Sequence, residues 1–278
     1  MPEPVPFPLP LTYLFVPGNR PERFAKALAS GADRVIIDLE DAVAPADKAD
    51  ARTAIADWMR GAGEQRAKVL IRVNDAASPW HADDLQLAAQ VQATCVMLPK
   101  CETASQVTAV LALLPPTATV LPLIETARGM TALAEIATAP RVSRLAFGSL
   151  DYMADLEIPA DSLALDIAAT HIAVASRAAG LPSPVAGVTP ELDTARVTAD
   201  MQQARRLGFG AKMCIHPSQI AAVQAALMPS AAELAWADRV LQAWQHSDGS
   251  AIQLDGRMVD RPVALRAERI AALSRHTH

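Results

Sequence analysis

Two acidic residues near the middle of the chain are spaced so that they can hold a divalent metal ion. Glu125 ends the predicted strand Val120–Glu125, and Asp151 ends the next predicted strand, Leu145–Asp151. Neighbouring parallel strands lie about 4.8 Å apart, so acids at the same rim of two such strands can reach one small cation. One or two carboxylates, completed by water and substrate oxygens, are the usual ligands of Mg²⁺. The alternative, which the spacing leaves open, is that both acids interact with the positive end of a helix dipole.

An arginine ends another apolar run and can bind an oxyanion. Arg72 lies near the end of the predicted strand Val69–Asn74, where its planar guanidinium matches the oxygens of a substrate carboxylate or of an enolate. The alternative is that Arg72 pairs with Glu40 or Asp41 at the end of the neighbouring strand and neutralises their charge. Both can hold, because such pairing also keeps the arginine in position. Glu40 and Asp41 are therefore candidate substrate-binding residues together with Arg72.

Two polar turns are candidates for binding the phosphates or thioester arm of a larger substrate. Gly18–Pro21 carries Asn19 and Arg20 just before a predicted helix, and a helix N-terminus beside a cation suits an anion. Lys212 comes directly before the last predicted strand and His216 ends it, next to the first strand in a closed barrel. The two loops can thus act together. The Gly18–Pro21 segment is equally compatible with a plain turn that binds nothing. His216 is equally compatible with a hydrogen-bonded residue at the rim.

A repeat of strand and helix positions these residues. The apolar runs are Tyr13–Pro17, Arg34–Glu40, Val69–Asn74, Cys95–Lys100, Val120–Glu125, Leu145–Asp151 and Met213–His216, with a weaker one at Val185–Thr189. Ala-rich amphipathic segments follow them, so the pattern predicts an α/β fold, a (β/α)8 TIM barrel. The active site of such a barrel lies at the C-terminal ends of its strands. The residues at those ends are Glu40, Asp41, Arg72, Asn74, Lys100, Glu125, Asp151 and His216.

The barrel is predicted to occupy residues 1–229, followed by a C-terminal extension, residues 230–278. A chain of 278 residues, of which 51% are hydrophobic, can bury one large core, and a barrel of about 250 residues uses nearly all of it. A helix (Ala232–Trp244), a hairpin-like piece (Ala251–Asp260) and a last helix after Pro262 remain. They have no place inside a closed barrel. We therefore expect a helical lid that packs on the barrel or on a neighbouring subunit.

Composition and charge exclude several classes of partner. The net charge of −5 is mild, and no dense cluster of Lys and Arg predicts binding to nucleic acid or to an anionic membrane. No uninterrupted apolar stretch has the length of a membrane span, and the Pro-rich N-terminus lacks the apolar core of a signal peptide. Cys95, Cys101 and Cys214 form neither an even set nor a CxxC motif, which favours a reduced, cytoplasmic location.

Eight short motifs follow one another along nearly the whole chain. They are Leu14–Pro21, Asp38–Val43, Ile71–Asn74, Leu98–Lys100, Ile124–Ala127, Phe147–Gly148 with Asp151–Tyr152, Ile215–Ile220 and Asp255–Asp260. Together and in this order, they resemble the HpcH/HpaI aldolase family, in the branch of citrate lyase β-subunits and malyl-CoA lyases.

The resemblance implies a Mg²⁺-dependent carbon–carbon lyase of the oxo-acid-lyase type, acting on a malyl-, citramalyl- or citryl-type thioester. It implies that Glu125 and Asp151 hold the ion and that Arg72 contacts the oxo-acid fragment. It also implies that the first and last βα loops bind coenzyme A, and that the C-terminal segment covers a neighbour's active site in a homotrimer. Within that segment, Asp260 matches the family's acid/base residue.

Two positions depart from the family pattern. Leu11 stands where many members have Arg, and Leu150 stands where many have Glu. We therefore expect the thioester contacts and the surroundings of the metal to differ, and the acyl group stays open, as does the choice between coenzyme A and a carrier protein. A thioesterase on the same scaffold is the alternative among enzymes. A non-catalytic thioester-binding subunit is the alternative outside them, although binding alone does not require the complete set of candidate catalytic residues.

Overall fold

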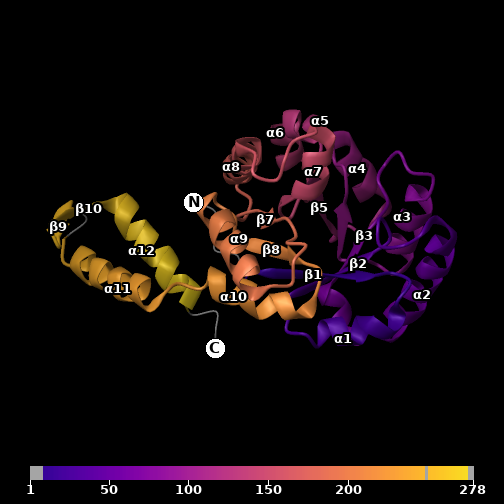
Figure 1. Cartoon of the computed structure of the whole chain (residues 1–278), viewed down its shortest axis with the longest axis horizontal. Helices are drawn as coiled ribbons and strands as arrows, with labels where there is room; N and C mark the ends of the chain where they lie inside the picture. The colour runs from indigo at the N-terminus through magenta and orange to yellow at the C-terminus, as the bar shows by residue number, and fades with distance from the viewer. Residues whose placement is uncertain (1–8, 248–249, 275–278) are drawn as a thin grey trace. The chain divides into compact units, whose positions relative to one another are not determined.

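A closed barrel of parallel strands forms the larger of two compact units. The computed structural model describes residues 9–247 and 250–274, and these divide into residues 9–224 and the segment that starts at residue 225. Within the described residues of the first unit, eight strands pair in chain order from β1 to β8, and β8 pairs with β1 (Figure 1). The predicted α/β fold with a (β/α)8 TIM barrel is therefore confirmed.

The strands agree with the predicted apolar runs but are mostly shorter. They are β1 (Thr12–Pro17), β2 (Arg34–Asp38), β3 (Val69–Arg72), β4 (Cys95–Leu98), β5 (Thr119–Ile124), β6 (Ala146–Phe147), β7 (Val185–Ala186) and β8 (Ala211–Cys214). All four residues of β3 and of β8 are buried, as expected for parallel strands covered on both faces. The barrel interior is filled by alternate side chains, among them Ile36, Met97 and Leu121.

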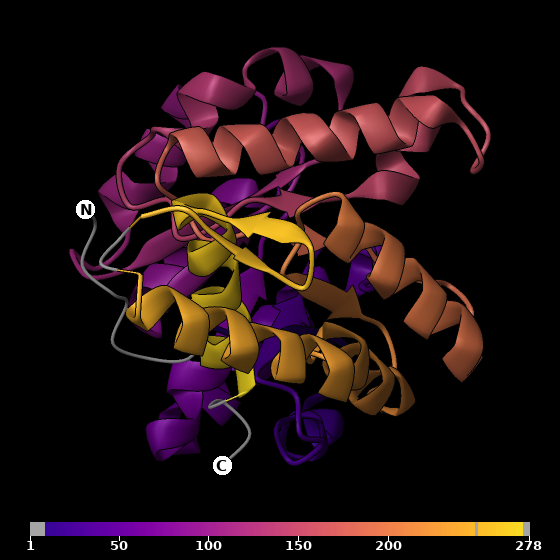
Figure 2. The same ribbon diagram turned by 90° about the vertical axis from the view of Figure 1, so that its left-hand side faces the viewer.

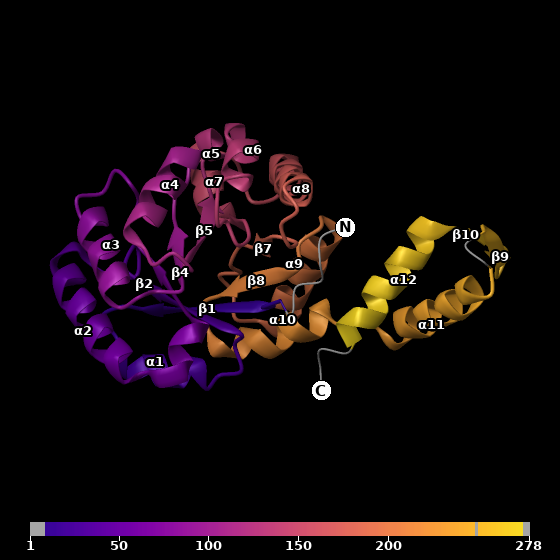
Figure 3. The same cartoon turned by 180° about the vertical axis from the view of Figure 1, so that it is seen from behind.

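Helices surround the barrel on its outer side (Figures 1 and 3). They are α1 (Phe24–Leu28), α2 (Lys48–Gly61), α3 (His81–Gln90), α4 (Ala104–Leu113), α5 (Ala127–Thr131), α6 (Leu133–Ala137), α7 (Ser149–Leu156), α8 (Leu163–Ala178), α9 (Thr194–Arg206) and α10 (Ile220–Leu227). Side-chain caps begin several of them: Thr103 and Gln106 form a capping box at α4, which satisfies backbone donors that the first turn leaves free.

One predicted strand is wrong in its second half. The run Leu145–Asp151 was expected to be extended throughout, but β6 ends at Phe147 and α7 begins at Ser149. Gly148 lies against the Glu125 side chain, and a Cβ at this position would come within 2.2 Å of Glu125 Oε2. The close approach requires glycine here, and the chain turns directly into a helix.

The second unit is a small helical module with its own apolar core. It contains α11 (Ala231–Gln245), the antiparallel strands β9 (Ile252–Leu254) and β10 (Arg257–Val259), and α12 (Arg261–Ser274). The hairpin, drawn in yellow in Figure 2, turns through Asp255 and Gly256, both with positive φ, as a two-residue type I′ turn requires. Ala237, Val240 and Ala267 are among the buried residues of the core. The predicted helix, hairpin and helix are thus present.

The predicted domain boundary falls in the connection between α10 and α11, whereas the two compact units divide between residues 224 and 225, within α10. Residues 228–230 are not helical, and the boundary was expected between residues 229 and 230. The stretch Pro217–Gln245 is long and apolar enough, by length and composition, to cross a membrane, and 33% of its most apolar window is buried. Because residues 228–230 interrupt it, the stretch is not one continuous helix. The prediction that the protein has no membrane partner stays a prediction.

Candidate active site

Four of the candidate residues meet in a cavity at the C-terminal ends of the strands. The cavity has a volume of about 390 Å³, and its lining includes Arg72, Glu125 and Asp151 together with Asp38 and Asp41. The residues come from the ends of β2, β3 and β5 and from the start of α7. This is the end of a TIM barrel at which active sites lie, so the structure brings the predicted metal and substrate residues into one place.

Glu125 is buried with one free carboxylate oxygen. It directly follows β5 and is 1% exposed. Its Oε1 accepts a hydrogen bond of 2.8 Å from the Lys100 backbone N–H, whereas its Oε2 has no hydrogen-bond partner among the described residues. Burial, together with the nearby charges of Glu40 and Asp151, raises the pKa of Glu125 to about 8. A buried anion with a free oxygen is costly unless a proton or a cation compensates it.

Asp151 lies in the first turn of α7 and not at the end of a strand. The alternative interpretation from the sequence, an acid at a helix N-terminus, therefore describes its backbone correctly. Its exposed side chain nevertheless lines the cavity, and its charge is close enough to contribute to the raised pKa of Glu125. The helix-terminus interpretation thus describes where Asp151 lies, and its role as a metal ligand stays a prediction.

The two acids fit a hard divalent cation. No group of three or more His, Cys, Asp or Glu side chains in the described ranges is arranged to hold a metal. The candidate protein ligands are therefore the two carboxylates of Glu125 and Asp151. Mg²⁺ is commonly bound by one or two carboxylates, and water and substrate oxygens complete its octahedron. The free Oε2 of Glu125 and the exposed carboxylate of Asp151 meet this requirement.

Arg72 is held in a rigid acidic cradle. Its Nε and Nη2 each donate a hydrogen bond of 2.7 Å to the carboxylate of Asp38, and its Nη1 lies 2.7 Å from Glu40 Oε2 and 3.6 Å from Asp41 Oδ2. The guanidinium also lies over the Phe15 ring, 4.9 Å from its centroid. The pairing with Glu40 and Asp41 that the sequence left as an alternative is therefore present. Arg72 also lines the cavity, and its role in substrate binding stays a prediction.

Asp38 is a functional candidate that the sequence reasoning missed. It is 1% exposed, and besides Arg72 it accepts hydrogen bonds from the backbone N–H groups of Glu40 at 2.9 Å and Ala42 at 3.1 Å. One carboxylate thus fixes both the guanidinium and the loop that follows β2. Asp38 could have been predicted from the sequence, because it is an acid at the end of an otherwise apolar strand of the barrel.

A buried lysine supports the same loop from behind. Lys48 is 3% exposed, and its Nζ donates to Leu39 O at 2.7 Å, to Glu40 O at 2.9 Å and to Asn74 Oδ1 at 2.7 Å. The Asn74 amide nitrogen donates in turn to Asp84 Oδ2 at 2.6 Å. Asn74 was predicted at the strand end, and the structure gives it this positioning contact.

Glu40 and Lys100 form an ion pair beside the metal candidates. Lys100 Nζ lies 3.2 Å from Glu40 Oε1. Burial raises the pKa of Glu40 to about 7, although the charge of Arg72 opposes the shift. The φ of Lys100 is 45°, in the left-handed region, and this turn aims its backbone N–H at Glu125. Lys100 therefore contacts two acids of the mouth, one through its side chain and one through its backbone.

The four residues predicted to bind the thioester are not all brought together. Asn19 Nδ2 donates to Asp47 Oδ2 at 3.3 Å, and Arg20 is exposed. Lys212 is buried, donates to Gly187 O at 2.7 Å and lines a different cavity, between α8 and α9. The roles of all of these residues remain predictions, but Lys212 lies away from the mouth cavity.

His216 belongs to a cavity that the sequence did not predict. This cavity of about 380 Å³ lies between the loops after β1 and β8, and His216 lines it together with Arg23 and Lys26 of the first helical segment. The His216 ring accepts a hydrogen bond from the Ser218 backbone N–H at 3.2 Å, so it also caps a short 3₁₀ helix. The first and last loops therefore do meet. The two cations beside His216 come from the α1 region, one turn after Arg20.

Asp260 lies in the second unit at the start of α12. Its Oδ1 accepts a hydrogen bond from the Val263 backbone N–H at 3.2 Å, as an N-cap side chain does. Asp260 follows β10 directly, so the hairpin places it. Its predicted role as an acid/base residue rests on the resemblance and stays a prediction.

Replacing Arg72 by lysine should lower kcat/KM by more than about tenfold, which corresponds to about 1.4 kcal/mol of transition-state stabilisation. An ammonium group cannot reproduce the two-pronged contact with a carboxylate or an enolate. The matched control is Arg52→Lys, because Arg52 also pairs with two acids, Asp83 and Asp84, but does not line the cavity. Steady-state kinetics of both variants check the prediction. Unchanged kcat/KM for Arg72→Lys would leave Arg72 with a structural role alone.

The fold and the cavity together define a class of protein: a TIM barrel with an acidic mouth that fits a divalent cation and contains a buried arginine. The family model described as HpcH/HpaI aldolase/citrate lyase matches residues 11–217. The chain belongs to this family, which confirms the resemblance found in the sequence.

Individual proteins of known name and structure are also similar to this chain. A citrate lyase subunit beta-like protein of Mycobacterium tuberculosis is 40% identical over 263 residues, covering 92% of each chain. A (3S)-malyl-CoA thioesterase of Cereibacter sphaeroides is 34% identical over 275 residues, covering 93% of this chain and 95% of the relative. The crystal structure of CitE from M. tuberculosis in complex with magnesium, acetoacetate and coenzyme A superposes with a TM-score of 0.85 at 37% identity, covering 95% of this chain and 98% of that one.

Proposed function

We propose that this protein is a Mg²⁺-dependent lyase that cleaves or forms a β-hydroxyacyl thioester of the malyl, citramalyl or citryl type. The products of cleavage are an acyl thioester and a 2-oxo acid. The observation that carries the proposal is the buried Glu125 carboxylate with a free Oε2, in one cavity with Asp151 and Arg72. A similar structure that contains magnesium, acetoacetate and coenzyme A supports the choice of ligands.

Each residue has a defined task in the proposed cleavage. Glu125 and Asp151 would hold the Mg²⁺ ion, which when bound lowers the pKa of a chelated hydroxyl and neutralises developing negative charge. Arg72, fixed by Asp38, orients the oxo-acid fragment and stabilises oxyanion charge. The substrate hydroxyl gives up its proton to solvent as the carbon–carbon bond breaks, its oxygen becomes the carbonyl of the 2-oxo acid, and the electron pair of the broken bond passes into the thioester enolate. Asp260 then delivers a proton to the enolate carbon, a role that depends on geometry.

The thioester arm is assigned to the loops after β1 and β8. His216, Arg23 and Lys26 line one cavity there, and cations at this position suit the phosphates of coenzyme A or of a carrier-protein arm. Asn19 and Arg20 remain candidates for the rim of this site. Lys212 stays a predicted contact, although its buried position favours a structural role.

We further propose that the protein acts as a homotrimer in the cytoplasm and that Asp260 serves the active site of a neighbour. Large apolar side chains on α8 support association between copies: Leu163 is 70%, Ile167 50% and Val174 62% exposed. Leu163, Ile167 and Val174 fall on one face of the helix, and contiguous exposed apolar patches mark interaction sites.

A thioesterase is the second candidate function, because a relative that covers 93% of the chain is a (3S)-malyl-CoA thioesterase. In that reaction, water attacks the thioester carbonyl and no carbon–carbon bond breaks. Leu150, which lines the cavity and is 41% exposed, is the departure from the family pattern that lies nearest to this chemistry.

An assay of the purified protein with Mg²⁺ against malyl-, citramalyl- and citryl-CoA separates the candidates. We expect 2-oxo acid to form from at least one substrate, with thioester retained in the acyl product. Free thiol without oxo acid would identify a thioesterase. Neither product from any of the three substrates would contradict both activities and favour a thioester-binding subunit.

A further inference from the structure

A second cavity lies at the opposite end of the barrel from the candidate active site. It has a volume of about 320 Å³ and is lined by the first residues of several strands, including Arg34 of β2, Cys95 of β4 and Thr119 of β5. Its size falls within the range of small-molecule pockets, about 300–1,000 Å³. None of the proposed lyase residues lines it, so the proposed function gives it no task.

A buried arginine without an acidic partner forms one wall. Arg144 is 3% exposed, and its guanidinium donates to Pro10 O at 2.7 Å and to Ser183 O. No carboxylate in the described part of the chain lies within 4.0 Å of it. Burial lowers the pKa of Arg144, although a hydrogen bond with Tyr13 opposes the shift. A buried charge of this kind is costly unless a counter-ion compensates it.

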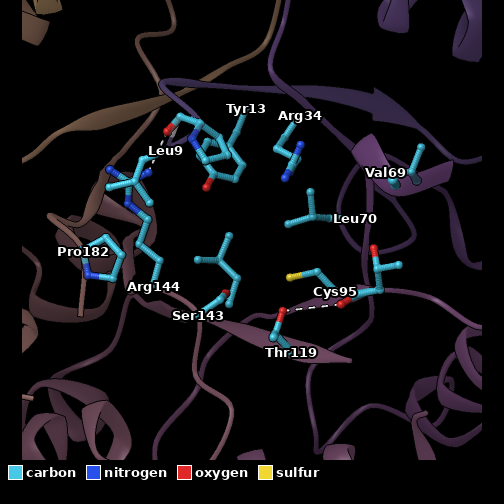
Figure 4. A pocket seen from close by; sticks show the side chains of 14 residues that line it. Leu9, Tyr13, Arg34, Val69, Leu70, Cys95, Thr119, Ser143, Arg144 and Pro182 are labelled. Atoms are coloured by element: carbon cyan, nitrogen blue, oxygen red, sulfur yellow. Dashed lines mark hydrogen bonds between the residues drawn. The ribbon is translucent and has the colours of Figure 1, made fainter. Parts of the chain in front are cut away.

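A second arginine approaches from the neighbouring side. Arg34 pairs in register with Tyr13, and in Figure 4 the two guanidinium groups lie on either side of the Tyr13 side chain. Arg34 donates to the backbone carbonyl of Asp33 at 3.2 Å, and it has no ion pair among the residues for which the structure gives contacts. The Asp33 carboxylate accepts instead from Leu11 and Thr12.

Hydroxyl groups complete the polar part of the lining. Tyr13, Thr119 and Ser143 all line the cavity, although the Thr119 and Ser143 hydroxyls donate to Thr94 O at 3.4 Å and to Val120 O at 3.2 Å. Two cations, polar hydroxyl groups and no acid in the lining make an environment that favours a negatively charged occupant. Planar guanidinium groups match the oxygens of carboxylate and phosphate.

We propose that this cavity binds a small oxyanion, a carboxylate or a phosphate group, between Arg34 and Arg144. The anion supplies the countercharge that the described residues do not provide. The site lies at the N-terminal ends of the strands, so its occupant is separate from any ligand of the mouth. The proposal does not depend on the lyase reaction.

Calorimetric titration of the metal-free, full-length protein tests the proposal. Potassium phosphate and potassium acetate are titrated separately, and potassium chloride keeps the ionic strength constant. We expect saturable binding of one anion or both, and Arg34→Gln should raise its Kd by at least about tenfold, since it removes charge-assisted hydrogen bonds. Binding of phosphate alone identifies a phosphate group as the occupant, and binding of acetate alone identifies a carboxylate.

Two further variants locate the binding. Arg141→Gln is the matched control, because the Arg141 guanidinium likewise donates to backbone carbonyls but does not line the cavity. It should leave the Kd unchanged. Thr119→Val should weaken binding with less disturbance than a change of charge. Absence of saturable binding, or equal Kd values for Arg34→Gln and the unaltered protein, would overturn the proposal.

Discussion

Replacement of Glu125 by glutamine is expected to abolish Mg²⁺-dependent turnover, with a loss of about a thousandfold or more, because a ligand charge worth several kcal/mol is removed. The fold should persist, since the amide is isosteric and can keep accepting the Lys100 N–H bond. The readout that does not depend on activity is Mg²⁺ affinity, measured by calorimetry. Full activity together with unchanged metal affinity would refute the assignment.

The matched control for this variant is Glu102→Gln. Glu102 accepts a hydrogen bond from Thr126, the residue after Glu125, at 3.0 Å, but it does not line the mouth cavity. It should therefore retain both metal affinity and turnover. A parallel loss in the control would point to a general disturbance of the rim.

The raised pKa of Glu125 adds a pH dependence to the same experiment. With its pKa near 8 in the metal-free protein, Glu125 carries a proton at neutral pH, and a bound cation must displace it. Mg²⁺ affinity should therefore rise as the pH increases from 6 towards 8 and level off above that value. The pH dependence should largely disappear in Glu125→Gln, because the amide has no proton to release.

The barrel could be predicted because its strands are buried on both faces. The run Val35–Ile37 in β2 is continuously apolar and almost fully buried, a pattern typical of parallel strands. Strand ends were less predictable. β6 and β7 contain two residues each, so their apolar runs say little about where the strands stop. The placement of Asp151 in α7 follows from the fit of Gly148 against Glu125, a contact between distant residues that periodicity does not report.

The site could be predicted in its residue types but not in its connections. Rim positions alone identified Arg72, Glu125 and Asp151, because the C-terminal ends of barrel strands meet at one mouth. Asp38 was missed because it occupies the last position of a strand that was expected to continue to Glu40. Lys48 lies in an amphipathic helix, where its sequence pattern is that of a surface lysine. Its partners become visible only when the chain folds.

Replacing Asp260 by asparagine is expected to stop the proton exchange at the enolate carbon, with a loss of at least about a hundredfold in turnover, as for other general acids and bases. Asparagine caps helices about as well as aspartate, so α12 should keep its N-terminal hydrogen bond. The control is Asp255→Asn in the same hairpin, where Asn-Gly suits the type I′ turn. It should retain activity, and circular dichroism should show both variants folded.

Mixing the two inactive variants tests whether Asp260 acts across subunits. If a barrel uses the Asp260 of a neighbour, random exchange between equal amounts of Asp260→Asn and Glu125→Gln subunits leaves about a quarter of the sites with both intact residues, in a closed ring. Activity should then recover to about that fraction. Native mass spectrometry shows whether hybrid oligomers form. If they form but stay inactive, Asp260 does not serve a neighbour. Each chain in the mixture lacks one of the two residues, so a site completed within one chain is always defective. The metal assignment would stand unchanged, since it rests on Glu125 and on the affinity measurement.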